Sequence, residues 1–188
     1  MKDFPEVQFG KDGDFNLDPS MKGIVLAGGC FWGTEEYMRR LPGVLKAISG
    51  YANGNGENPS YEEVCTGRTG FAEAVFVEYD SSLLSLKNLI THFFYTINPL
   101  QVNGQGNDRG SQYRSGIYYL YPEDIPVIEK EMNRLGEELG QAIATELKPL
   151  KNFYKAEEYH QRYLQKNPGG YCHVSFDTLP KGEEKLGK

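Results

Sequence analysis

Paired cysteines and long apolar runs are both scarce in this sequence. Three cysteines in 188 residues are too few, and too odd in number, for a secreted disulfide framework, and no close pair is typical of a zinc knuckle. No run of about 18 apolar residues, the length needed to cross a membrane, occurs. We therefore expect reduced or catalytic thiols in a soluble, cytoplasmic protein, with no metal or other cofactor.

Positive charge is also in short supply. The chain carries 20 Lys and Arg against 26 Asp and Glu, a net charge of −6. Nucleic acid and anionic membranes both favour a basic face, so neither is expected as a partner. Acidic residues, among them Asp3 and Glu6, stand where a signal peptide needs an apolar core. A small or peptidic substrate remains open.

Hydrophobic residues make up 39% of the chain and aromatic residues 13%, enough for a sizeable core without disulfides. At roughly 150 residues per domain, one domain is expected. Composition divides the chain into a polar N-terminal tail (1–20), an α+β domain that carries the candidate chemistry (21–167) and an irregular C-terminal tail (168–188). We expect a monomer.

Hydrophobic periodicity predicts the order of elements. Strands are expected over 22–27, 44–51, 72–79 and 115–121, and helices over 31–41 and 83–97. This β-α-β-β-α-β order predicts a ferredoxin-like two-layer sandwich, with both helices on one face of the sheet. Further helices are expected over 122–140 and 156–166, and an extra strand over 142–147.

Cys30 follows Gly28 and Gly29, where the first strand gives way to the first helix. Unpaired amides and the helix dipole at such a junction favour thiolate, although most free cysteines are small buried hydrophobes. The glycines would let another molecule approach closely. Phe31 and Trp32 come next and cannot share one helix face; both are candidates for core packing or for an apolar pocket beside the cysteine.

Candidate acids and hydroxyls lie at the ends of strands. Glu73 begins an apolar strand, and burial there would raise its pKa until it could donate a proton at pH 7. By residue type alone, an exposed carboxylate is the commoner outcome. Tyr61 lies in the first glycine-rich loop, and Asp108 and Tyr113 lie in the second. Each alone is more often structural, but loops on a rigid scaffold are where catalytic groups concentrate.

The remaining cysteines and the histidines give weaker signals. Cys172 follows two glycines near the chain end, where mobility would let it travel, and Cys65 is interpreted as inert. His92, His160 and His173 show no metal-ligand spacing with one another or with the cysteines, so a zinc site is not expected.

Five separated blocks resemble the peptide methionine sulfoxide reductases of the A type and fall in that family's order. They are GCFWG at 29–33, NPSYEEVCTG at 58–67, TGFAEAV at 69–75, QGNDRGSQYRS at 105–115 and NPGGYC at 167–172. The resemblance implies a nucleophile, Cys30, a proton donor, Glu73, and a resolving cysteine, Cys172. It further implies hydroxyls on the sulfoxide oxygen (Tyr61, Tyr113), an apolar seat for the methyl group (Phe31, Trp32) and a residue that positions substrate (Asp108).

The same resemblance implies the S epimer of methionine sulfoxide, free or in proteins, as substrate and thioredoxin as reductant. Two departures stand out. Phe71 replaces the family's usual His before the acid, and no cysteine follows Cys172. Recycling would then need a single internal disulfide exchange.

The implied chemistry makes opposite demands on two groups. A thiolate displaces a sulfoxide oxygen only if that oxygen gains a proton, so a low-pKa thiol and a raised-pKa acid must share one pocket. The resulting sulfenic acid condenses with a second thiol. Other functions remain possible on these residues: a thiol peroxidase, a cysteine acyl-transfer enzyme with His160 as base, or a binding module with an incidental thiol.

Overall fold

The central sheet of the computed structural model is mixed, and the structure describes residues 7–10 and 17–181. Its seven strands follow the order β1-β9-β3-β4-β2-β7-β8. They are β1 (Gln8–Phe9), β2 (Lys22–Gly28), β3 (Val44–Ala52), β4 (Ala72–Tyr79), β7 (Ser115–Tyr119), β8 (Glu146–Pro149) and β9 (Asn152–Lys155). A separate two-stranded sheet pairs β5 (Gly104–Gln105) with β6 (Asp108–Arg109). The mixed α+β class predicted from the sequence is confirmed.

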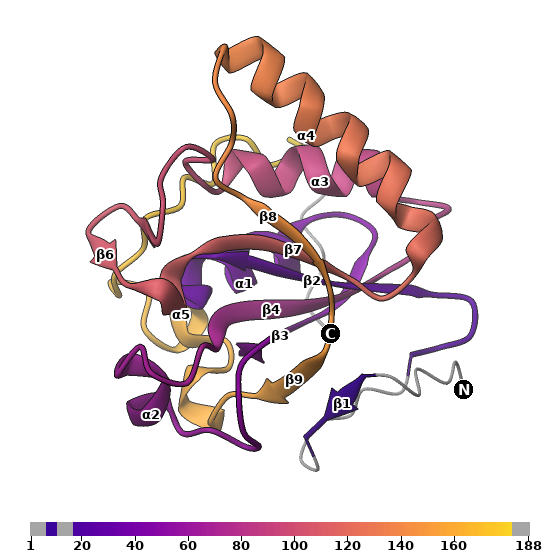
Figure 1. Ribbon diagram of the computed structural model, residues 1–188. Helices are drawn as coiled ribbons and strands as arrows, with labels where there is room; N and C mark the ends of the chain where they lie inside the picture. Colours follow the sequence, from indigo (N-terminus) through magenta and orange to yellow (C-terminus); the bar gives the residue numbers. More distant parts are fainter. Residues whose placement is uncertain (1–6, 11–16, 182–188) are drawn as a thin grey trace.

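Five α-helices occur in the described part of the chain. They are α1 (Phe31–Arg40), α2 (Tyr61–Cys65), α3 (Leu86–Tyr95), α4 (Ile125–Leu139) and α5 (Tyr163–Lys166). In Figure 1, α3 and α4 lie side by side, and a contact of 3.5 Å between Thr91 Oγ1 and Glu131 Oε2 joins them. No helix of the described residues is both long and apolar enough to span a bilayer.

The four middle strands are antiparallel: β3 pairs with β4, β4 with β2, and β2 with β7. Both faces of these strands are covered, which explains their nearly continuous apolar runs. On one face, Ile24 and Leu26 of β2 join a core cluster with residues of α1 and α3, such as Met38 and Ile90. Alternate residues such as Val25 face a second cluster. The two predicted crossover helices therefore share one face.

Several boundaries differ from the sequence-based prediction. The helix expected over 83–97 is α3, which starts later because Ser85 caps it, its side chain accepting a hydrogen bond from Asn88 N. The helix expected from 122 begins with a 3₁₀ turn, and Pro126 is tolerated because it lies in the first turn of α4. The extra strand expected over 142–147 begins only at Glu146. It pairs in parallel with β7.

The prediction of a helix over 156–166 is wrong. This region instead follows strand β9 with a 3₁₀ turn and then the four-residue helix α5. Arg162 adopts a positive φ of 53°, which ends any continuous helix. Long-range bonds hold the segment in that path: Gln161 Nε2 donates to the Ser49 carbonyl at 2.8 Å, and Arg162 N donates to Glu35 Oε1 at 2.8 Å.

Several small elements were not predicted, strand β9 among them. Within the expected N-terminal tail, β1 pairs in parallel with β9. Helix α2 lies in the first glycine-rich loop, where Ser60 and Glu63 form a capping box. The β5–β6 hairpin lies in the second loop and carries Asp108.

Candidate active site

Cys30 is the N-cap residue of α1, directly after the Gly29 turn with its positive φ of 81°. Glu73, at the start of β4, accepts a hydrogen bond from Phe31 N at 3.1 Å. The acid thereby satisfies one of the free amides at the start of the helix that carries the thiol. Glu73 thus bonds to the residue that follows Cys30 and is near enough for its charge to raise the pKa of the Cys30 thiol.

The strand pattern explains the burial of Glu73. It has the same parity on β4 as Val75, Val77 and Tyr79, which face the core cluster beneath α1. Glu73 is 1% exposed. Burial raises its pKa from 4.5 to about 8, aided by the Asp108 carboxylate and opposed by the Phe31 N–H. Of the two outcomes that the sequence left open for Glu73, the structure has the buried acid with a raised pKa and not the exposed carboxylate.

The Cys30 thiol does not show the low pKa predicted from its place at a helix N-terminus. Its pKa is raised, first by burial and next by the charge of Glu73, while a backbone bond from Trp32 opposes the shift only partly. Cys30 is 8% exposed. Desolvation therefore outweighs the backbone hydrogen bond from Trp32, and the prediction of a thiol with a lowered pKa is wrong.

The other ionisable candidates surround this pair. Asp108 and Cys172 both lie close enough to raise the pKa of the Cys30 thiol. The pKa of Tyr113 is raised by burial and then by Glu73, Asp108, Cys65 and Cys30. The structure thus brings together residues from β4, the β5–β6 hairpin, the following 3₁₀ turn and the C-terminal segment.

Tyr61 belongs to the same group but has a local partner. Its pKa is raised by burial, by a hydrogen bond to Cys65 and by Glu73. Cys65 lies at the exposed end of α2. The Tyr61 hydroxyl is therefore near Glu73, and it is engaged by a cysteine that the sequence analysis interpreted as inert.

Asp108 presents a free acceptor. Its Oδ2 atom is buried and finds no hydrogen-bond partner among the described residues. The Tyr171 hydroxyl is bonded to the Asp108 side chain, although burial is the larger cause of that tyrosine's raised pKa. A buried carboxylate oxygen without a donor is rare in a folded protein and suits a donor supplied by a bound molecule.

Phe31 and Trp32 diverge, as consecutive helical residues must. Phe31 is 1% exposed and belongs to the core. Trp32 is only partly buried, and it stacks on Tyr163 of α5 with ring centroids 3.6 Å apart and an interplanar angle of 8°. Both rings contact His160, at 5.1 Å from Phe31 and 5.9 Å from Trp32. An apolar wall therefore begins beside Cys30.

His160 is the main residue of this wall that the sequence analysis did not assign to it. Its Nδ1 accepts a hydrogen bond from Trp32 Nε1 at 3.0 Å. Its ring centroid lies 4.6 Å from that of Tyr61. Because Nδ1 serves Trp32, this geometry does not favour His160 as the base of an acyl-transfer enzyme. Its place in the EEYHQRY segment, rich in aromatic and polar residues, is a signal only in retrospect.

Glu157 and Tyr51 connect the elements around the site, and neither was predicted from the sequence. Tyr51 lies opposite Glu73 on the neighbouring strand, and its hydroxyl donates to Glu157 Oε1 at 2.9 Å. Glu157 Oε2 accepts from Tyr61 N at 3.1 Å. Burial raises the pKa of Glu157, but these bonds outweigh it and hold the pKa below its ordinary value. The carboxylate thus fixes β3 and α2 together.

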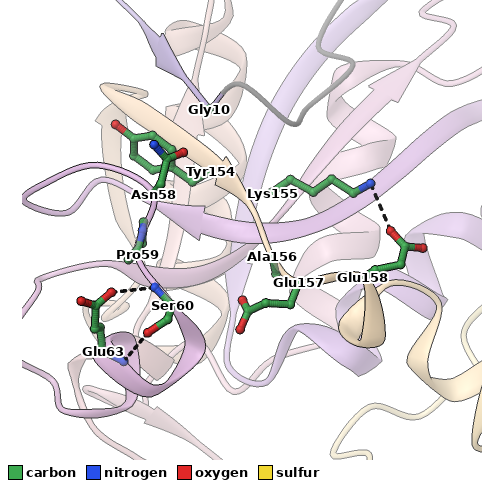
Figure 2. Close-up of a pocket in the computed structure, with 10 residues that line it drawn as sticks. All are labelled: Gly10, Asn58, Pro59, Ser60, Glu63, Tyr154, Lys155, Ala156, Glu157 and Glu158. Atoms are coloured by element: carbon green, nitrogen blue, oxygen red, sulfur yellow. Dashed lines mark hydrogen bonds and ion pairs between the residues drawn. The ribbon is translucent and has the colours of Figure 1, made fainter.

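A separate, open cavity of about 590 Å³ lies between the start of α2 and the end of β9, and Figure 2 shows the residues that line it. It shares Glu157 with the site, but none of Cys30, Glu73 and Asp108 lines it. Its lining is Gly10, Asn58, Pro59, Ser60, Glu63, Tyr154, Lys155, Ala156, Glu157 and Glu158. The thiol and the acid meet elsewhere, so this cavity is not the candidate active site.

Comparison with known proteins identifies the family. The family model described as "Peptide methionine sulfoxide reductase" matches residues 22–186. The chain is 57% identical over 157 residues to peptide methionine sulfoxide reductase MsrA of Clostridium botulinum (strain Okra / Type B1), covering 84% of this chain and all of that protein.

Two solved structures of Saccharomyces cerevisiae Mxr1 are similar. The reduced form matches with a TM-score of 0.80 and 42% identity, over 84% of this chain and 92% of that one. Mxr1 in complex with Trx2 matches with a TM-score of 0.58 and 30% identity, over 80% of this chain and 90% of that one. The chain belongs to the peptide methionine sulfoxide reductase family, A type.

Proposed function

We propose that this chain reduces methionine S-sulfoxide, free or in proteins, to methionine, with Cys30 as nucleophile and Glu73 as proton donor. The observation that carries the proposal is their juxtaposition: a buried acid with a pKa of about 8 bonded to the first amide of the helix that Cys30 caps. At neutral pH such an acid is protonated and carries no charge that would oppose a thiolate.

The proposed first step transfers oxygen from substrate to enzyme. Cys30 gives up its thiol proton and attacks the sulfoxide sulfur, while Glu73 protonates the oxygen. The attack forms a bond between the Cys30 sulfur and the substrate sulfur; this bond and the substrate S–O bond then break as the hydroxyl oxygen passes to Cys30, and two electrons pass to the substrate sulfur. The products are methionine and the sulfenic acid of Cys30, and the proton that Cys30 released balances the one that Glu73 supplied.

The tyrosines would stabilise the oxygen as it gains charge. Burial raises the pKa of both Tyr61 and Tyr113, so their hydroxyls keep their protons and can donate. Tyr61 would exchange its bond to Cys65 for one to the sulfoxide oxygen. Two such donors in a site largely shielded from water act where the charge develops.

Substrate would be held by an apolar wall and one polar anchor. Trp32, fixed by His160 and Tyr163, and the neighbouring Phe31 would contact the methyl group. Asp108, with its unpartnered oxygen, would accept a hydrogen bond from a substrate N–H. This combination matches the common design of small-molecule sites, mostly apolar with a few placed polar groups.

Recycling would run through Cys172. Its thiol attacks the Cys30 sulfenic acid, so that a Cys30–Cys172 disulfide forms and water leaves, and thioredoxin then reduces the disulfide. Cys172 is close enough to raise the pKa of the Cys30 thiol. The solved complex of Mxr1 with Trx2 supports thioredoxin as the reductant.

The wider interpretation of the chain also remains a proposal. Residues 21–167 would form the catalytic domain, whose β2-α1-β3-β4-α3-β7 centre is of the ferredoxin-like type; the strand order and the shared helix face support this. Residues 1–20 and 168–188 would be appendages, the second carrying Cys172. A cytoplasmic location stays a prediction.

The test is turnover with separate sulfoxide epimers. With thioredoxin and its reductase, the enzyme should reduce peptides that contain the S epimer and leave the R epimer unchanged, and Cys30→Ser should be inactive but folded. Hydrogen peroxide serves as the rival substrate. Faster reduction of peroxide than of the S-sulfoxide, or activity in Cys30→Ser, would refute the proposal.

A further inference from the structure

The chain after α5 forms no further helix or strand through residue 181, yet part of it packs closely along α1. The Thr178 hydroxyl lies 3.0 Å from the Tyr37 hydroxyl, and the Phe176 ring stacks with the Tyr37 ring at 6.4 Å. The Arg40 guanidinium lies 4.6 Å from the centre of the Phe176 ring. The segment from 172 to 179 is therefore docked on the helix that begins at Cys30.

This docked segment leaves no room for a side chain at Gly33. A Cβ atom at position 33 would lie 2.9 Å from Cys172 Sγ, 2.8 Å from Val174 Cγ2 and 3.2 Å from Val174 Cβ. Ordinary contacts of a Cβ are 3.4–4 Å, so any side chain here would push the segment outward by about 0.5 Å. Gly33 is the third residue of α1, is buried, and has no positive φ that would call for glycine.

A helical glycine needs a reason, because glycine in a helix interior is about 1 kcal/mol less favourable than alanine. Here the missing side chain makes room for the sulfur of Cys172. Gly33 also stands three residues after Cys30, one turn along the same helix. We propose that Gly33 is a positioning residue that seats Cys172 against α1 for attack on the Cys30 sulfenic acid.

This inference rests on the proposed resolving role of Cys172. In the resolving step the Cys172 sulfur bonds to the Cys30 sulfur, and the sulfenic hydroxyl leaves as water with the Cys172 proton. Disulfides require an S–S distance of about 2.05 Å and a narrow range of dihedral angles. Because a misplacement of about 1 Å can slow a reaction about 10²-fold, a shift of about 0.5 Å should slow this step about tenfold.

The test separates the two half-reactions in Gly33→Ala. Enzyme without reductant is mixed with S-sulfoxide peptide and quenched at intervals; methionine, dimedone-trapped sulfenic acid and the Cys30–Cys172 disulfide are quantified. Methionine should form at the wild-type rate, and the disulfide about tenfold more slowly, with sulfenic acid accumulating. Gly33→Ala with Val174→Ala, which removes the Val174 Cγ2 contact and leaves those with Val174 Cβ and Cys172 Sγ, should recover part of the disulfide rate.

Gly136→Ala is the matched control, since it places the same substitution in α4, where the nearest atom would be Gln141 O at 3.3 Å. It should leave both steps unchanged. A wild-type disulfide rate in Gly33→Ala, or methionine formation slowed as much as disulfide formation, would overturn the positioning role. Cys172→Ser is measured alongside: full thioredoxin-linked turnover in that variant would refute the proposed resolving cysteine itself.

Discussion

Replacing Glu73 by Gln tests whether the buried acid is the proton donor. With a pKa of about 8, Glu73 is about 90% protonated at pH 7, whereas an ordinary Glu at 4.5 would be about 0.3% protonated. Burial thus raises the population of the proton-donating form about 300-fold. Glutamine keeps the size of the side chain and can still accept from Phe31 N, but it has no acidic proton.

We expect Glu73→Gln to slow methionine formation about 10²-fold or more, the usual scale of general-acid catalysis. The assay is single-turnover methionine release at pH 7 without reductant, with circular dichroism to confirm folding. The rate in wild-type enzyme is the reference. A variant that releases methionine within about threefold of the wild-type rate would show that Glu73 supplies no essential proton, contrary to the general-acid effect expected of it.

Three further predictions use the same site. Because the pKa of Glu73 is about 8 when folded against 4.5 when unfolded, its stabilisation is present below pH 4.5 and is lost as pH rises toward 8. The Tm of Glu73→Gln minus the Tm of wild type should therefore increase as the pH rises from 5 to 8. A difference that stays constant over this range would contradict the raised pKa. Trp32→Phe removes the donor to His160 Nδ1 and should raise KM about tenfold with a smaller change in kcat; an unchanged KM would place Trp32 outside the substrate wall. Cys65→Ser should keep most thioredoxin-linked activity, and a large loss would make Cys65 a participant.

The order of the central elements could be predicted from sequence because these strands are buried on both faces. Their burial gives β2 and β4 continuous apolar runs, and the helices that follow them show helical periodicity. Both patterns can be recognised within short stretches of sequence. For Glu73 the sequence left a buried acid and an exposed strand-end carboxylate both open, and the fold decides for burial. Its parity on an apolar strand points it into the core.

The segment from 152 to 166 could not be predicted, because its path depends on contacts more than 100 residues away in sequence. Hydrogen bonds to Ser49 and Glu35 hold Gln161 and Arg162 in a path that is not helical. The same segment brings His160 and Tyr163 to Trp32. Local propensity carries no information about such partners.

The pKa of Cys30 was predicted with the wrong sign for a related reason. A helix N-terminus is visible in the sequence, but the degree of burial around it is a tertiary property. With Cys30 8% exposed and Glu73 beside it, desolvation decides the direction. Strand and helix order thus followed from the sequence more readily than the electrostatics of the residues between them.

The most direct test of the account is to identify which cysteines pair after one turnover. Reduced enzyme, freed of reductant, is treated with one equivalent of S-sulfoxide peptide, digested without reduction and analysed by mass spectrometry. The account predicts about one equivalent of methionine, consistent with a single reactive thiol per chain, and a crosslinked peptide pair containing Cys30 and Cys172, with Cys65 still a thiol. A disulfide that includes Cys65, or methionine formed while Cys30 stays a free thiol, would contradict it.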